Sequence, residues 1–149
     1  EQLLEHRVKF QNSEVEVEAR AQPHDIRRIL ELPGGSLPLL QGGDAAAKEI
    51  CANCAYDAGC DYDSRSHTGW SVFRKGLAVC DGYTAAYNLL LGLEGIDCRS
   101  QVNPDHMWTV ATLDGTEYHI DVTWGDQGYG PDHSCFAMTE RESYAMHAW

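Results

Sequence analysis

The chain has 149 residues, of which 43% are hydrophobic, so it is long and apolar enough to bury the core of one domain, and wholesale disorder is excluded. Its 11 basic and 23 acidic residues give a net charge of −12, which argues against nucleic acid as a partner because phosphates would be repelled. No apolar run approaches the ~20 residues that span a bilayer, so no membrane span is expected. The chain begins at Glu1 without a signal-peptide pattern, and we expect it to be a domain cut from a longer protein.

The N-terminal part predicts one strand and two helices. Residues Glu14–Arg20 alternate acidic and apolar side chains with a period of two, which indicates a half-exposed strand. The run PHDIRRILEL predicts a short helix after Pro23, and the breaker-rich run LPGGSLPLLQGG predicts a connection. Asp44 is then placed to cap the start of a helix that ends at Gly59.

The segment AVCDGYTAAYNLLLGLEGI predicts an amphipathic helix that begins at a cysteine. Apolar residues recur at spacings of three and four and form one stripe that should face a sheet: Tyr83, Ala86, Tyr87, Leu90 and Leu93. Cys80 falls in or just before the first turn, where unpaired N–H groups and the positive end of the helix dipole favour a thiolate over a thiol. Position alone also suits a small buried thiol without chemistry.

A hairpin is predicted between the runs DHMWTVATL and TEYHIDVTW. Asp114-Gly115 between them is the strongest short-range hairpin signal. With these two residues as the loop, His106 falls opposite Thr123, and Asp121 lies diagonal to His106 on the same face, within reach of a bridging contact. The other face carries an apolar set suited to a core: Met107, Ala111, Leu113, Tyr118, Ile120, Val122 and Trp124.

The order of these elements predicts an α+β fold, because helices come first and strands follow. At the end of the chain, Thr139 and Glu142 have the spacing of a capping box and predict a last short helix. We treat residues 1–43 as an N-terminal strand and helix extension of uncertain role, and residues 44–149 as the core of one compact domain.

A thiol, an imidazole and a carboxylate together form a unit for acyl transfer. The imidazole takes the proton of the thiol and holds the sulfur as a nucleophile near neutral pH. The carboxylate fixes the tautomer of the ring and stabilises its charged form. A backbone N–H at the helix start can donate to the oxyanion of a tetrahedral intermediate.

Three blocks of sequence together resemble the transglutaminase-like domain of the papain-like thiol superfamily, from about Lys48 to Trp149. The blocks are KGLAVCDGYTAAYNLLLGLEGIDC, DHMWTVATLDGTEYHIDVTWGD and SCFAMTERESYAMHAW. The resemblance implies a papain-like α+β core with the nucleophile helix packed on an antiparallel sheet. It implies Cys80 as the nucleophile, His106 as the general base and Asp121 as the orienting acid.

The resemblance, to a bacterial type of the family, also sets expectations for the activity. The substrate would be a protein or peptide, with a cell-wall peptide as one candidate, and no cofactor or metal is implied. Members of the family cross-link amines, hydrolyse amide bonds or only bind, so hydrolysis, amine transfer and a non-catalytic binding domain stay open. An extracytoplasmic or cell-surface location is favoured.

Some residues depart from the family pattern or are not placed by it. Met107 stands where the family usually has a small residue, and the second oxyanion donor is not assigned, with Trp70 and Tyr62 as candidates.

The remaining cysteines are ambiguous. A zinc site, a disulfide and free core thiols are all open for Cys51, Cys54 and Cys60 with His67, although a C-x2-C pair within one helix fits a packed face as well as a metal. Two further residues fall in predicted strands and are assigned to the core: Cys98 and Cys135. His119 shares the parity of Asp121, so a role as a supporting partner of the site is open, although an exposed strand residue is favoured.

Overall fold

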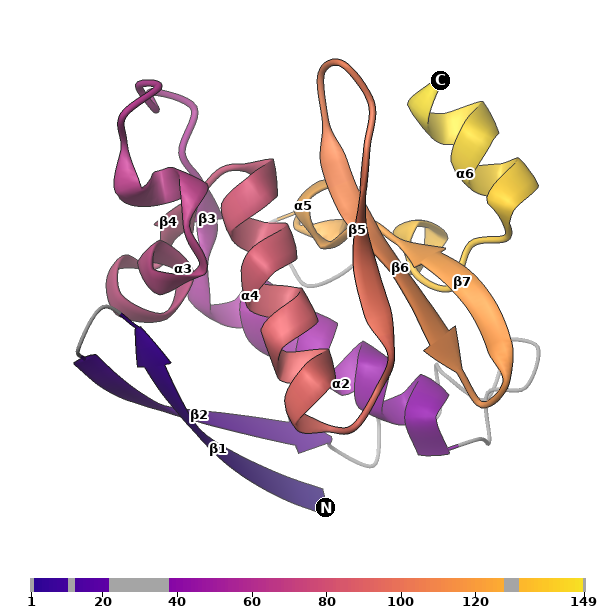
Figure 1. Ribbon diagram of the computed structural model, residues 1–149, viewed down its shortest axis with the longest axis horizontal. Coiled ribbons are helices and arrows are strands. Elements are labelled where there is room, and N and C mark those ends of the chain that lie inside the picture. The colour runs from indigo at the N-terminus through magenta and orange to yellow at the C-terminus, as the bar shows by residue number, and fades with distance from the viewer. Residues whose placement is uncertain (1, 11–12, 22–37, 128–131, 149) are drawn as a thin grey trace.

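The computed structural model describes residues 2–10, 13–21, 38–127 and 132–148, with side chains from residue 39 onward. In chain order the elements are β1 (Gln2–Phe10), β2 (Ser13–Ala21), α2 (Pro38–Asn53), β3 (Ala55–Tyr56), η1 (Arg65–His67), α3 (Gly69–Lys75), β4 (Leu77–Ala78), α4 (Cys80–Leu93), β5 (Cys98–Val102), β6 (Met107–Leu113), β7 (Thr116–Ile120), α5 (Val122–Gly125), η2 (His133–Cys135) and α6 (Glu140–His147) (Figure 1). None of the described helices combines the length and the apolar character that crossing a bilayer requires.

The α+β class is confirmed. Strands β5, β6 and β7 form an antiparallel sheet with β6 in the centre, and α4 packs on β5 and β6 while α2 packs beside α4 (Figure 1). A short parallel pair, β3 and β4, precedes α4 and joins Tyr56 to Ala78. This pairing brings Tyr56 next to the start of α4, two residues before Cys80.

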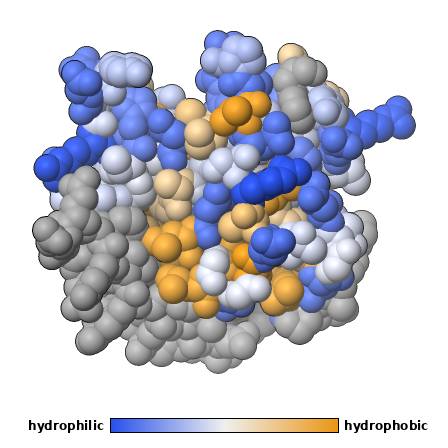
Figure 2. Space-filling model, viewed as in Figure 1, coloured by the Kyte–Doolittle hydropathy of each residue, from blue (hydrophilic) through white to orange (hydrophobic). Residues whose placement is uncertain are grey.

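Helix α4 buries the predicted stripe except at its end. Four of the five residues are 0–1% exposed: Tyr83, Ala86, Tyr87 and Leu90. The prediction that Leu93 belongs to the buried stripe was wrong: its side chain is 40% exposed. The helix ends at Leu93, and the N–H of Ile96 donates to the carbonyl of Leu91. Leu91 and Ile96 lie in the core in place of Leu93. Figure 2 shows hydrophobic side chains gathered over the middle of the view, where α4 and α2 lie.

The hairpin has the predicted two-residue loop. Leu113 pairs with Thr116, and Asp114 and Gly115 both have positive φ, at 51° and 85°, as a type I′ turn requires. Strand β7, however, ends at Ile120 rather than continuing through residue 123. The chain turns there because the side chain of Asp121 caps the short helix α5 (Val122–Gly125).

Helix α2 begins earlier than predicted. The assignment of Asp44 as the N-cap was wrong: the helix starts at Pro38, whose fixed φ suits a first helical position, and Asp44 lies inside it. The cap comes from the hairpin, where Asp114 Oδ2 accepts the N–H of Leu40 at 2.9 Å. Asp44 is fully buried and pairs with Lys48 and with His133. The helix ends at Asn53, not at Gly59.

Strand β6 is buried on both faces. The prediction that only the face with Met107 and Ala111 packs into a core was therefore incomplete. Trp108 and Val110 lie on the face opposite Ala111 and are 1% exposed, and α6 covers Trp108. His119 was predicted to be exposed but is 3% exposed, and its Nδ1 accepts the indole N–H of Trp108 at 3.0 Å. Trp124, assigned to the core, is 40% exposed because it follows the turn into α5.

The N-terminal residues form an antiparallel pair of strands. The predicted strand Glu14–Arg20 lies within β2 and is confirmed, and β1 pairs with it in register from Gln2–Ala21 to Phe10–Ser13. The predicted helix after Pro23 lies outside the described residues. The predicted boundary between residues 43 and 44 falls inside α2.

Candidate active site

Cys80 occupies the first position of α4 and is partly exposed. Val79 before it is extended, and its N–H donates to the carbonyl of Ser66 at 3.0 Å. Gly82 lets the first turn approach this neighbouring backbone, because a Cβ at position 82 would lie 2.4 Å from Ser66 O. The N–H of a first helical residue has no acceptor within its own helix. Cys80 therefore presents both a reachable sulfur and a backbone donor at one place.

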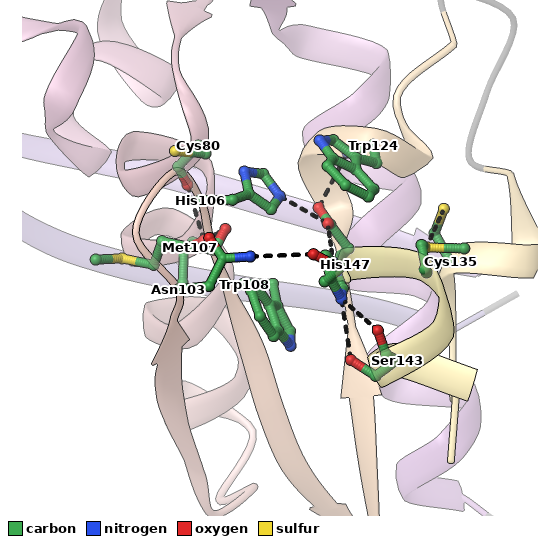
Figure 3. A network of polar contacts seen from close by, with 12 residues as sticks. Cys80, Asn103, His106, Met107, Trp108, Trp124, Cys135, Ser143 and His147 are labelled. Carbon is green, nitrogen blue, oxygen red and sulfur yellow. Dashed lines mark hydrogen bonds and ion pairs between the residues drawn. The ribbon is translucent and has the colours of Figure 1, made fainter. Parts of the chain in front are cut away.

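A buried threonine ties the start of α4 to the strand that follows His106. The hydroxyl of Thr84 lies 2.8 Å from the carbonyl oxygen of Cys80 and 3.2 Å from that of Met107. Thr84 is 3% exposed, so this contact is shielded from water. In Figure 3, Cys80 and the ring of His106 lie next to each other above this junction.

His106 contacts Asp121 as the hairpin register predicted. His106 Nε2 lies 2.7 Å from Asp121 Oδ2, and the two side chains are 9% and 0% exposed. Burial alone would lower the pKa of His106, but its interactions with Asp121 and with Cys80 outweigh this and raise the pKa to about 9. Since Nε2 faces Asp121, Nδ1 is the nitrogen that remains for Cys80. The ring stacks on Trp124, with 4.6 Å between centroids.

Asp121 is held by three donors. Its Oδ1 accepts the backbone N–H of Trp124 at 3.0 Å, which makes Asp121 the N-cap of α5. Its Oδ2 contacts Nε2 of His106 and, at 2.8 Å, Nε2 of His147. Burial would raise the pKa of Asp121, but the hydrogen bonds from the two histidines and Trp124 bring it below its ordinary value. The carboxylate is therefore ionised although it is out of contact with water.

His147 was missed by the sequence reasoning. The capping box correctly placed α6, with Thr139 as its N-cap, and His147 is the last residue of that helix. Nothing in the local pattern connects it with Asp121, 26 positions earlier. The one available signal was the presence of a histidine, His147, near the end of the predicted last helix.

A cleft of about 540 Å³ borders His106. Its walls come from β3, α5, η2 and α6 and are formed by Tyr56, His106, Thr123, Trp124, Asp126, Gln127, Asp132, Ser134, Cys135 and Met146. Burial raises the pKa of Tyr56, and an electrostatic interaction with Cys80 adds to this effect.

The two predicted candidates for the second oxyanion donor do not line this cleft. Tyr62 is 95% exposed. Trp70 lies under Arg65 and Lys75, at 4.9 and 5.8 Å from its ring centroid. Tyr56, which was not among the predicted candidates, is an aromatic donor that does line the cleft.

The other cysteines are free thiols in separate environments. Burial raises the pKa of Cys51 to about 12 and that of Cys135 to about 11. Cys54 is buried in the same core as Cys51, whereas Cys60 Sγ lies 3.4 Å from Nε2 of His67. The zinc interpretation required these three cysteines to share a site, whereas the structure separates them into a core pair and a surface contact, and none of them forms a disulfide.

Two assignments in the C-terminal half are modified. Cys135 lies in η2 rather than in a strand, although it is buried as expected, and Cys98 begins β5 and is half-buried. Among the described residues, one group of three has ligand-type atoms within 4.8 Å of one another: His106, Asp121 and His147. The two short hydrogen bonds to Asp121 account for that proximity.

Comparison with known proteins supports the fold. No family model matches the sequence, and no curated protein matches it. A solved structure described as the crystal structure of a TGase resembles the protein with a TM-score of 0.51 and 12% sequence identity, over 69% of this chain and 33% of that chain. The chain thus spans about a third of the length of that structure. At this identity the likeness is one of fold, and it supports a transglutaminase-like arrangement of the helices and the antiparallel sheet.

Proposed function

We propose that the protein is a thiol-dependent acyl-transfer enzyme that acts on amide bonds of a protein or peptide. The observation that carries the proposal is the 2.7 Å contact between His106 Nε2 and Asp121 Oδ2, on a ring whose pKa Cys80 and Asp121 together raise to about 9. In this proposal Cys80 is the nucleophile, His106 the general base and Asp121 the orienting acid. The three groups come from separate parts of the chain: Cys80 begins α4, His106 directly precedes β6, and Asp121 caps α5.

The proposed reaction has two halves. His106, whose raised pKa keeps it protonated near neutral pH, holds Cys80 as a thiolate, and Sγ attacks the amide carbon. The tetrahedral intermediate collapses to a thioester as the C–N bond breaks, and His106 gives its proton to the departing amine. Water or an amine then attacks the thioester, His106 takes the proton of that nucleophile, and the thiolate of Cys80 departs, which restores the pair of thiolate and protonated His106.

Two donors are available for the oxyanion of the intermediate. One is the backbone N–H of Cys80 at the first helical position. The other is the hydroxyl of Tyr56, which lines the cleft with His106. We assign Tyr56 as the second donor in place of Tyr62 and Trp70.

The acidic wall of the cleft favours a cationic substrate group. Asp126 and Asp132 lie on it, and the chain carries a net charge of −12. Peptides with a free amine should therefore bind better than acidic ones, and an amine acceptor would be drawn to the thioester. A cell-wall peptide, which combines amide bonds with amines, remains a candidate substrate.

The test is a brief exposure to iodoacetamide followed by mass spectrometry of each cysteine. An ordinary thiol is a few per cent thiolate at pH 7, so a thiolate held by His106 should react about ten times faster than the half-buried Cys98. His106→Gln should remove this advantage. His133→Gln is a matched control, because it breaks another 2.7 Å His–Asp contact that does not involve Cys80.

The rival function is a non-catalytic domain that uses the cleft only for binding. A binding domain has no need of an activated sulfur, so equal alkylation of Cys80 and Cys98 would favour it and would count against the enzyme. In a screen of peptides and amines, the enzyme loses all turnover in Cys80→Ala while the fold persists. Retained turnover in that variant would overturn the assignment of the nucleophile.

A further inference from the structure

His147 is a buried polar residue with a place in the candidate site but no part in the reaction described above. Its side chain is 0% exposed. The ring lies face to face on Trp108, with 3.7 Å between centroids and 5° between planes, and 4.8 Å from the ring of Trp124. Figure 3 shows His147 on the far side of the network from Cys80, with Trp108 against it. This packing leaves the ring one orientation.

The orientation directs Nε2 of His147 at Asp121. The contact with Oδ2 is 2.8 Å, on the same oxygen that His106 approaches at 2.7 Å. Asp121 is 0% exposed, so no water is available to replace either donor. With His106 alone, burial would make Asp121 a stronger base, and the carboxylate would compete with His106 for the proton between them.

The ionised carboxylate of Asp121 keeps Nε2 of His147 in the donor role, because a carboxylate can only accept a hydrogen bond. Nδ1 of the ring lies 2.9 Å from the carbonyl oxygen of Ser143 and 3.1 Å from its hydroxyl. The charged ring donates from Nδ1 to the carbonyl, and the neutral ring protonated on Nε2 accepts from the hydroxyl at Nδ1, whereas a neutral ring protonated on Nδ1 would set a bare Nε2 against the carboxylate. In the first two states Nε2 carries a proton that points at Asp121.

We propose that His147 is a positioning residue for the acyl-transfer reaction, an inference that rests on the proposed function. By donating to Oδ2, it holds Asp121 ionised and in line with His106, so that His106 keeps its proton on Nε2 and presents Nδ1 to Cys80. The site is then a series of four side chains, Cys80, His106, Asp121 and His147, in which the last never touches the substrate.

Other titratable groups surround this series. Cys135 on η2 accepts the backbone N–H of Asp121 at its carbonyl, and burial raises the pKa of its thiol to about 11, so the thiol stays neutral between pH 6.5 and 8. His119 on β7 faces His147, and burial lowers its pKa while Trp108 donates to its Nδ1. Neither Cys135 nor His119 changes its charge between pH 6.5 and 8. A change at His147 therefore acts on the protonation of His106, Asp121 and Cys80.

The first experiment uses the wild-type protein. Nitrogen NMR of ¹⁵N-labelled histidine should show a proton on Nε2 of both His106 and His147 at every pH from 6 to 8. An unprotonated Nε2 on His147 in this range would overturn the proposal, and it needs neither a variant nor a substrate.

The second experiment compares two variants by the pH profile of Cys80 alkylation. His147→Phe keeps a ring on Trp108 and removes the donor, so the acid limb of the profile should move up by about one pH unit, because one hydrogen bond to a charged group is lost. His147→Gln keeps an N–H that can reach Asp121 and should restore most of the wild-type profile. A merely structural role predicts lower stability in both variants with no shift of the acid limb, and that result would refute the positioning role.

Failure of the proposed function can be told apart from failure of this inference, because the two affect different measurements. If Cys80 of the wild-type protein reacts no faster than Cys98, the enzyme assignment fails. The NMR spectra of His106 in wild type and His147→Phe still decide whether His147 orients the His106–Asp121 pair: a loss of the Nε2–H tautomer in the variant supports the inference, and an unchanged tautomer refutes it.

Discussion

Replacing Gly82 by alanine should destabilise the protein although it improves the helix. The new Cβ would lie 2.4 Å from the carbonyl oxygen of Ser66 and 3.0 Å from that of Thr68. Protein Cβ atoms hardly ever approach closer than 3.0 Å, so the start of α4 must move by at least the difference of 0.6 Å. Overpacking of backbone against backbone belongs at the upper end of the usual range, about 3 kcal/mol, and alanine returns about 1 kcal/mol of helix propensity. The net loss is about 2 kcal/mol.

Gly92, in the same helix, is the matched control. A Cβ there would meet nothing within 4 Å, so Gly92→Ala should raise the free energy of unfolding by about 0.5–1 kcal/mol. Urea unfolding followed by circular dichroism measures both variants, and the two should differ by about 3 kcal/mol. Alkylation of Cys80 should also slow in Gly82→Ala, because the displaced turn carries the sulfur away from His106. Equal stabilisation by both substitutions would refute the close-approach argument.

Three further predictions concern the site and the hairpin. Tyr56→Phe should lower the rate of amide cleavage about 10²–10³-fold without slowing alkylation of Cys80, as expected for an oxyanion donor; an unchanged rate in a peptide assay would exclude that role. Because the pKa of Asp121 is lowered on folding, its contribution to stability is present above about pH 4 and is lost as the pH falls through the lowered pKa; Asp121→Asn should therefore flatten the acid limb of urea-unfolding stability, and an equally steep limb would contradict the shift. Asp114→Ala removes the cap on Leu40 and places alanine at a φ of 51°, for a combined loss of about 2 kcal/mol in thermal unfolding, whereas Asp114→Asn should lose less than half of that.

Features with a local cause were predictable from the sequence. The hairpin follows from two adjacent residues that tolerate positive φ, and the last helix follows from a capping box in which Thr139 and Glu142 satisfy each other. Once the loop length was known, alternation along the strands placed His106 and Asp121 on one face. These predictions need only a few neighbouring residues, so a single sequence contains them.

Features that depend on distant partners were not predictable. The start of α2 depends on a carboxylate in the hairpin, and no pattern near Pro38 reveals it. The exposure of His119 was misjudged because a strand with alternating polarity shows which residues share a face, but not whether a helix covers that face. His147 was overlooked for the same reason, since its partner Asp121 is reached only after α6 folds back along β7.

The cap that Asp114 supplies to α2 also sets an order of events during synthesis. Leu40 precedes Asp114 by 74 residues, which at ~5–20 residues per second takes roughly 4–15 s to translate. Over that interval the first turn of α2 lacks the carboxylate that accepts the N–H of Leu40, so we expect this turn to fray. The hairpin closes within microseconds once β7 has followed the turn, and Asp114 can then accept the N–H of Leu40. A ribosome stalled before residue 114 should therefore hold a nascent chain whose α2 is open at its N-terminus.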